Sequence, residues 1–141
     1  MKVNFGLMVA GLGLLLTAAP AIAHHSFAAE YDGNKPITLK GTVTKIDWMN
    51  PHIWVYLDVK DDSGSVTHWQ CEGGPPNSLT RNGWTKDALK IGDQVTVEGF
   101  KAKDGTNTIN SRSVKLPDGR SVFAGSAEDG GPNARRGGGA Q

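Results

Sequence analysis

Four histidines carry most of the chemistry that this sequence could perform, and two of them stand together as His24-His25. A neutral imidazole is the commonest protein ligand for transition metals. His24 follows Ala21-Ile22-Ala23, which is the small-residue A-x-A pattern of a signal-peptide cleavage site. Cleavage after Ala23 would make His24 the first residue, so that its α-amine and its ring nitrogen could chelate one ion. The dipeptide therefore predicts a metal site that only export creates.

A third nitrogen would give a T-shaped site that suits Cu(II), and the sequence offers two further donors. His52 follows Asn50-Pro51 in a predicted turn, and His68 lies on the predicted outer face of a strand. The candidate metal ligands are therefore His24, His25, His52 and His68, and the candidate cofactor is copper. Each also has an ordinary interpretation, as a polar chain start, a turn residue bonded to backbone, or a surface histidine.

The first 23 residues have the features of a secretory signal peptide. Lys2 precedes an apolar stretch over residues 5–18, which is shorter than the roughly 20 residues of a transmembrane helix. We therefore expect a periplasmic or secreted protein with no membrane anchor after cleavage. The remaining 118 of the 141 residues suffice for one small domain.

The charge balance argues against two classes of partner. Lys2 is the only charged residue of the signal, so the 15 basic and 14 acidic residues of the whole chain become 14 of each after cleavage. Nucleic-acid binding and polybasic membrane contacts both depend on an excess of Lys and Arg. We expect a small ligand or metal ion as the partner, or another periplasmic protein.

Alternating and β-branched segments predict a sheet protein. The first strand is expected over residues 37–48, with a bulge near Thr44-Lys45 because the apolar parity changes there. Residues 53–60 alternate regularly, and a turn over 61–64 leads into a third strand over 66–72. Their parity places Val55, Leu57 and Trp69 in the core, with Cys71 buried beside them. Later strands are expected over 94–101, 108–116 and 121–123.

Two short helices are expected between the third and fourth strands, capped by Asn77 or Ser78 and by Thr85. This order predicts an all-β fold, a small five- to six-stranded OB-like barrel with a short helical connection between strands 3 and 4. A plain antiparallel sandwich is the alternative. The domain is expected over 37–124, after a mostly irregular arm over 24–36. A Gly-rich tail over 125–141 is too poor in apolar residues to fold.

Aromatic residues on the second strand suggest a second kind of site. Trp54 and Tyr56 share the face opposite Val55, and pairing with the third strand would add Gln70 and His68 to it. Exposed aromatic rings beside polar groups suit stacking on a sugar or another ring. Trp54, Tyr56 and Gln70 are therefore the candidate ligand-binding face, unless the arm covers them through Phe27 or Tyr31.

Several segments resemble a family of small secreted bacterial proteins that is classed as a domain of unknown function. They are AHHSFAAEYD after the signal, LKGTVTKIDWMNPHIWVYLDV with its NPH turn, the CEGGPP turn, RNGWTKDALKIGDQVTVEGF and KDGTNTINSRSVKLPDGR. The resemblance spans most of residues 23–124. It implies an exported OB-like barrel and no assigned activity.

No catalytic set stands out, because the serines lack a nucleophile-elbow context and no C-x-x-C or H-E-x-x-H motif occurs. We therefore expect an exported binding protein rather than an enzyme, with a copper-type divalent ion as the leading ligand. A carbohydrate- or protein-binding module using Trp54 and Tyr56 is the second hypothesis. A metal-dependent enzyme built on the N-terminal histidine is the third.

Overall fold

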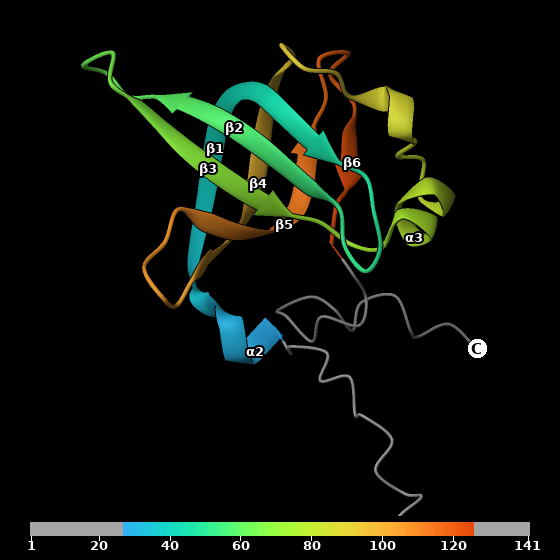
Figure 1. Ribbon diagram of the computed structural model, residues 1–141, viewed down its shortest axis with the longest axis horizontal. Helices are drawn as coiled ribbons and strands as arrows, with labels where there is room; N and C mark the ends of the chain where they lie inside the picture. The colour runs from blue at the N-terminus through green and yellow to red at the C-terminus, as the bar shows by residue number, and fades with distance from the viewer. Residues whose placement is uncertain (1–26, 126–141) are drawn as a thin grey trace, which may run out of the picture.

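The computed structural model describes residues 27–125, most of which lie in strands (Figure 1). The elements are α2 (Phe27–Glu30), β1 (Tyr31–Asp47), β2 (Trp54–Lys60), β3 (Val66–Glu72), α3 (Pro76–Arg81), the 3-10 helix η1 (Lys86–Ala88), β4 (Gln94–Ala102), β5 (Thr108–Lys115) and β6 (Ser121–Phe123). The predicted all-β class is confirmed, and so is the short helical connection between strands 3 and 4.

The strands form one sheet that closes on itself. Their order is β3-β2-β1-β4-β5-β6, and an additional pairing of β3 with β5 joins the two sides. The β3–β5 pair is parallel, and the other pairs are antiparallel. Closure removes the exposed sheet edges that an open sheet would leave, and the result is a small barrel-like fold. The finer OB-like assignment stays a prediction.

A bend in β1 allows this long strand to serve two neighbours. Its earlier part pairs with β4 and its later part with β2. The register shifts between Val43 and Lys45, which confirms the bulge predicted near Thr44-Lys45. A Cβ at Gly41 would lie only 2.7 Å from the carbonyl oxygen of Asp58, so a glycine is needed where the strands approach each other.

The arm is more regular than predicted. Phe27–Glu30 form a helical turn, and β1 begins at Tyr31, six residues before the predicted Ile37. Pro36 is an unfavourable residue inside a strand, because proline has no N–H for a sheet hydrogen bond. The register with β4 is irregular between Tyr31 and Pro36, which accommodates the proline, and Tyr31 pairs with Ala102 beyond it.

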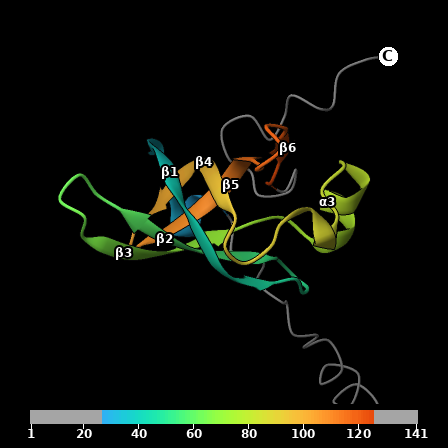
Figure 2. The same ribbon diagram turned by 90° about the horizontal axis from the view of Figure 1, so that it is seen from above.

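The helical connection differs from the prediction at its start. α3 begins at Pro76 after Pro75, with no side-chain cap, so the expected caps Asn77 and Ser78 are wrong. Proline suits this position because the first N–H groups of a helix have no intrahelical partner. Thr85 does precede η1, again without a side-chain cap. In Figures 1 and 2, α3 and the β2–β3 turn lie on opposite sides of the barrel.

The core contains the residues that strand parity assigned to it. Val55, Leu57 and Trp69 are 2%, 1% and 9% exposed, which confirms that prediction. Cys71 is buried with them, as predicted. Trp84, from the connection, packs edge-on against Trp48 with ring centroids 6.1 Å apart.

Within residues 27–125, no helix is both long enough and apolar enough to cross a membrane. The predicted signal peptide (1–23) lies outside the described residues. So does the predicted tail, apart from Gly125.

Candidate functional site

A buried carboxylate, Glu72, joins two residues that are distant in the sequence. Glu72 ends β3 and is 8% exposed. The hydroxyl of Tyr31, at the start of β1, donates a hydrogen bond to its Oε2 atom. Nδ1 of His52, in the connection between β1 and β2, contacts its Oε1 atom. We refer to these three residues as the Tyr31–Glu72–His52 cluster.

Strand alternation alone would leave Glu72 in solvent. Trp69 and Cys71 face the core, so Glu72 has the outward parity, and its register partners are Trp54 on β2 and Asn110 on β5. The N-terminal arm changes this environment by bringing Tyr31 to the carboxylate. An outward-facing residue of β3 thereby becomes a buried one.

Aromatic packing holds the arm in this position. Phe27 is 6% exposed and stacks on Tyr31, with ring centroids 5.8 Å apart. Its ring also meets Phe100 of β4 edge-on at 5.5 Å, and the Arg112 guanidinium lies 5.0 Å from its centroid. Ring pairs of this geometry stabilise beyond the area that they bury. The arm is therefore attached to the barrel by apolar contacts as well as by the Tyr31 hydroxyl.

The contact with Glu72 decides which nitrogen of His52 carries a lone pair. An ionised carboxylate only accepts hydrogen bonds, so Nδ1 of a neutral His52 must donate. The lone pair then lies on Nε2, which is the atom available for ligation in this tautomer. Metal-ligating histidines are commonly oriented in this way by a carboxylate on the other nitrogen. The His52 side chain is 22% exposed, so the ring is only partly shielded.

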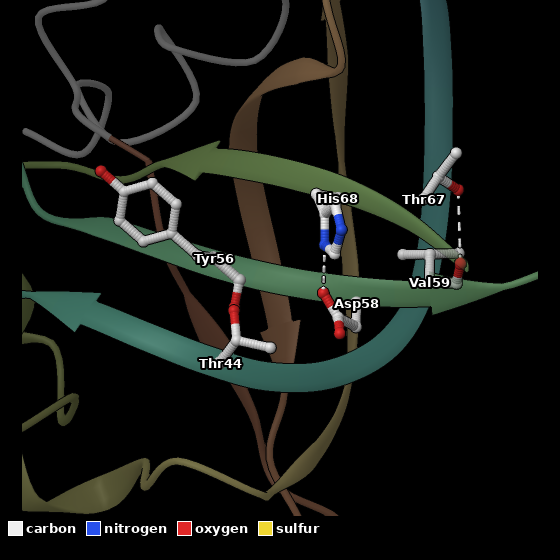
Figure 3. Close-up of polar contacts among 6 residues, drawn as sticks. All are labelled: Thr44, Tyr56, Asp58, Val59, Thr67 and His68. Atoms are coloured by element: carbon white, nitrogen blue, oxygen red, sulfur yellow. Dashed lines mark hydrogen bonds and ion pairs between the residues drawn. The ribbon is translucent and has the colours of Figure 1, made fainter.

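His68 belongs to a separate, exposed pair. Its Nδ1 lies 2.6 Å from Oδ1 of Asp58 across the β2–β3 ladder (Figure 3), and its side chain is 83% exposed. Asp58 pairs with His68, and Trp54 pairs with Glu72, so the two histidine–carboxylate contacts are four residues apart along the strands. At 3.3–3.4 Å per residue, this separation is about 13 Å. The structure therefore does not bring His52 and His68 together.

The remaining predicted ligands, His24 and His25, lie outside the described residues. Among residues 27–125, no group of three or more His, Cys, Asp or Glu side chains is arranged to hold a metal ion. Any complete site at His52 must therefore draw donors from elsewhere. Cys71 is a poor donor, because burial raises the pKa of its thiol to about 12 and disfavours the thiolate that binds metals.

The predicted ligand-binding face divides into two environments. The Tyr56 hydroxyl donates to Oδ2 of Asp47 on β1 at 3.1 Å, and the Lys45 ammonium lies 4.8 Å from the centre of its ring. Burial, and then the bond to Asp47, raise the pKa of Tyr56 above its usual value, so the phenol stays protonated at neutral pH. Gln70 is exposed directly opposite Tyr56.

Trp54 has different surroundings, although it lies on the same side of β2 as Tyr56. It lines an open pocket of about 520 Å³ between the arm and the β4–β5 turn. The pocket is bounded by two residues of α2, four strand residues and two residues of the β4–β5 turn, namely Ala29, Glu30, Tyr31, Trp54, Ala102, Lys103, Asp104 and Thr108. The arm thus borders Trp54 without closing over it.

Sequence reasoning did not identify the cluster. The sequence suggests Tyr31 only as a residue through which the arm could cover the aromatic face of β2, and it assigns no role to Glu72. The available signal was the outward parity of Glu72 on β3, the same as that of His68 and Gln70. The contact itself depends on a fold that brings residues 31, 52 and 72 together.

The fold and this cluster define a small barrel-like domain in which one buried carboxylate contacts both a histidine and Tyr31 of the N-terminal arm. The chain belongs to the family of unknown function DUF6152, whose model matches residues 12–111. That range includes all three residues of the cluster, and the match supports the resemblance to a domain of unknown function. No curated protein and no solved structure matches the chain.

Proposed function

We propose that this protein is an exported binding protein for a copper-type divalent metal ion, with Nε2 of His52 as one ligand. The observation that supports this is the buried contact between His52 and Glu72. A carboxylate on Nδ1 fixes the tautomer and raises the basicity of Nε2. A histidine that served only to satisfy a turn would not need a buried carboxylate partner.

The mature N-terminus supplies the other proposed ligands, the α-amine and ring of His24, with His25 as a further donor. Phe27 packs on Tyr31, which is bonded to Glu72, which contacts His52. Successive Cα atoms are 3.8 Å apart, so the Cα of His24 stays within about 11 Å of that of Phe27. This short tether makes a site shared between the chain start and His52 compatible with the described contacts. Nitrogen donors favour copper over nickel and zinc.

The N-terminal ligand is tested by moving the α-amine. Protein that begins at His24 is compared with the same chain carrying one extra glycine before it, using titration calorimetry with Cu(II) against a competing chelator. We expect about one ion per chain and a large loss of affinity in the extended form. Equal affinity in both forms would remove the N-terminal chelate from the proposal.

The role of His52 is tested with His68 as a matched control. Both histidines bond to a carboxylate through Nδ1, but only His52 is partly buried beside the arm. His52→Ala should weaken Cu(II) binding by at least about tenfold and change the copper spectrum, whereas His68→Ala should do neither. Equal effects of the two substitutions would contradict the assignment of His52.

A second candidate function is a carbohydrate- or protein-binding module on the face of Trp54, Tyr56 and Gln70. The observation in its favour is that Tyr56 and Gln70 lie directly opposite each other on adjacent strands, beside Trp54. An aromatic ring next to an amide suits recognition of a sugar ring. Titration with oligosaccharides, with Tyr56→Ala as the variant, tests it in metal-free protein. Unchanged affinity in Tyr56→Ala would count against this face.

A further inference from the structure

The pocket beside Trp54 has the size of a small-molecule site and an aromatic wall. Its volume of about 520 Å³ exceeds what a bare ion would fill and lies within the usual range for metabolite pockets. The rings of Trp54 and Tyr31 contribute apolar surface, and the Thr108 hydroxyl adds a polar group. Trp54 is half-buried, so part of its indole remains open to a ligand.

The charges around this pocket favour a cation. The residues that line the pocket include two carboxylates, Glu30 and Asp104, and one lysine, Lys103. The Lys103 ammonium already donates to the carbonyl oxygen of Ala28 at 2.6 Å, and its backbone N–H donates to that of Glu30 at 2.8 Å. The lysine is therefore occupied in attaching the β4–β5 turn to the arm.

Asp104 is held in an ionised, oriented state. Its Oδ1 accepts hydrogen bonds from the backbone N–H and the hydroxyl of Thr106 at 2.9 and 2.7 Å. These bonds lower the pKa of Asp104 below its usual value, so the carboxylate is charged at neutral pH. Both of these bonds fall on Oδ1, so they fix the orientation of the carboxylate at the edge of the pocket.

We propose that the pocket lined by Trp54, Tyr31 and Asp104 binds a small organic ammonium ion, with its cationic group over the indole of Trp54. A cation is attracted to the negative face of an aromatic ring, and tryptophan is the strongest of the three rings in this respect. Carboxylates at the edge of the pocket add attraction that a neutral sugar would not gain. The proposed metal ligand His52 does not line this pocket, but Tyr31 links the two sites through Glu72, so the titration is run without metal.

The test uses the metal-free protein beginning at His24 and two probes of nearly equal shape. Choline carries a quaternary ammonium, and 3,3-dimethylbutan-1-ol replaces that group with a neutral tert-butyl. We expect saturable movement of the Trp54 indole N–H signal in NMR spectra with choline, and binding at least about fivefold weaker for the neutral alcohol. Raising the salt concentration should weaken choline binding further.

Variants locate the site. The variants are compared by titration calorimetry, because Trp54→Leu and Trp54→Phe have no Trp54 indole signal. Trp54→Leu should abolish choline binding, whereas Trp54→Phe should retain part of it, which separates loss of the ring from loss of the fold. Asp104→Asn should weaken binding severalfold. Asp118→Asn is the matched control, because Asp118-Gly119 forms a similar turn in which Oδ1 accepts from a backbone N–H two residues later at 2.9 Å.

Three results would overturn the proposal. Equal binding of both probes would remove the role of charge. Binding of glucose with the same Trp54 response, in the absence of a choline response, would assign the pocket to neutral sugars. A choline response that is unchanged in Trp54→Leu would place the site elsewhere. Failure to bind copper would leave this proposal standing, since the titration contains no metal.

Discussion

The hydroxyl of Tyr31 and the carboxylate of Glu72 lie 41 positions apart in the sequence and share a buried hydrogen bond. This bond attaches the start of the described chain to the end of β3. The same carboxylate contacts His52 through its other oxygen. The Glu72 side chain therefore contributes both to the attachment of the arm, together with the packing of Phe27, and to the orientation of the imidazole.

Glu72→Gln should lower the free energy of unfolding by about 1–3 kcal/mol. The amide keeps the shape of the side chain but offers one oxygen to two donors, so either Tyr31 or His52 loses its acceptor. Urea denaturation measures the change. Glu98→Gln is the control, because Glu98 is exposed and bonded only to Ser113 at 2.9 Å in the described structure. An equal loss in both variants would mean that the buried cluster adds nothing to stability.

Leu57→Ala should cost roughly 2–5 kcal/mol of stability, because the side chain is 1% exposed in the closed barrel and its removal leaves a cavity. Val66→Ala, on the neighbouring strand, removes a side chain that is 46% exposed and should cost less than about 1 kcal/mol. Denaturant titration of both proteins gives the comparison. A loss below half a kcal/mol in Leu57→Ala would contradict the assigned face.

Gly99→Ala should destabilise the β4–β5 pair by about 1–3 kcal/mol or more. A Cβ at this position would lie 2.1 Å from the carbonyl oxygen of Asn110, which is backbone and can move only with its strand. Gly64→Ala meets no atom within 4 Å and should cost only the left-handed conformation at φ +87°, about 1–2 kcal/mol. The melting temperature of Gly99→Ala should therefore be lower than that of Gly64→Ala. The reverse order would be evidence against the close strand contact.

Cys71 should not react with a thiol reagent in the native protein at pH 8. The thiol is buried, and burial raises its pKa to about 12, so that both access and thiolate are lacking. In urea the same residue should react fully within minutes. A colorimetric assay of thiol release follows both reactions. Rapid native labelling would show that this part of the core opens easily.

Residues close in sequence determined the local structure well. The strict alternation over 53–60 and the turn after it gave β2 and β3 nearly to the residue, and the parity change in β1 located its bulge. Each of these features depends on side-chain period or on backbone freedom at one position, which a single sequence displays. The predicted caps Asn77 and Ser78 were wrong because Pro75-Pro76 begins α3 without a side-chain acceptor, whereas Thr85 does stand at the start of η1.

The candidate site was only partly accessible to the same reasoning. The sequence suggested His52 as a metal ligand, and that role stays a prediction; what the structure adds is its contact with Glu72. The sequence could not decide between His52 and His68 as the third ligand. His52 precedes the β2–β3 hairpin and His68 lies within it, and only the fold places His52 beside Glu72 and His68 beside Asp58.

The sequence by itself determined the all-β class, the core face of the β2–β3 hairpin and the burial of Cys71, since alternation decides these within a few residues. Only the tertiary structure decided that Glu72 is buried and accepts a hydrogen bond from Tyr31. It also decided that Trp54 borders a pocket while Tyr56 donates a hydrogen bond to Asp47. These contacts join residues that are distant in the sequence, such as Tyr31 and Glu72 at 41 positions, and they are set by strand pairing and by the packing of Phe27. Burial of an outward-facing carboxylate requires an element that packs over it, and no local sequence pattern predicts where the arm will lie.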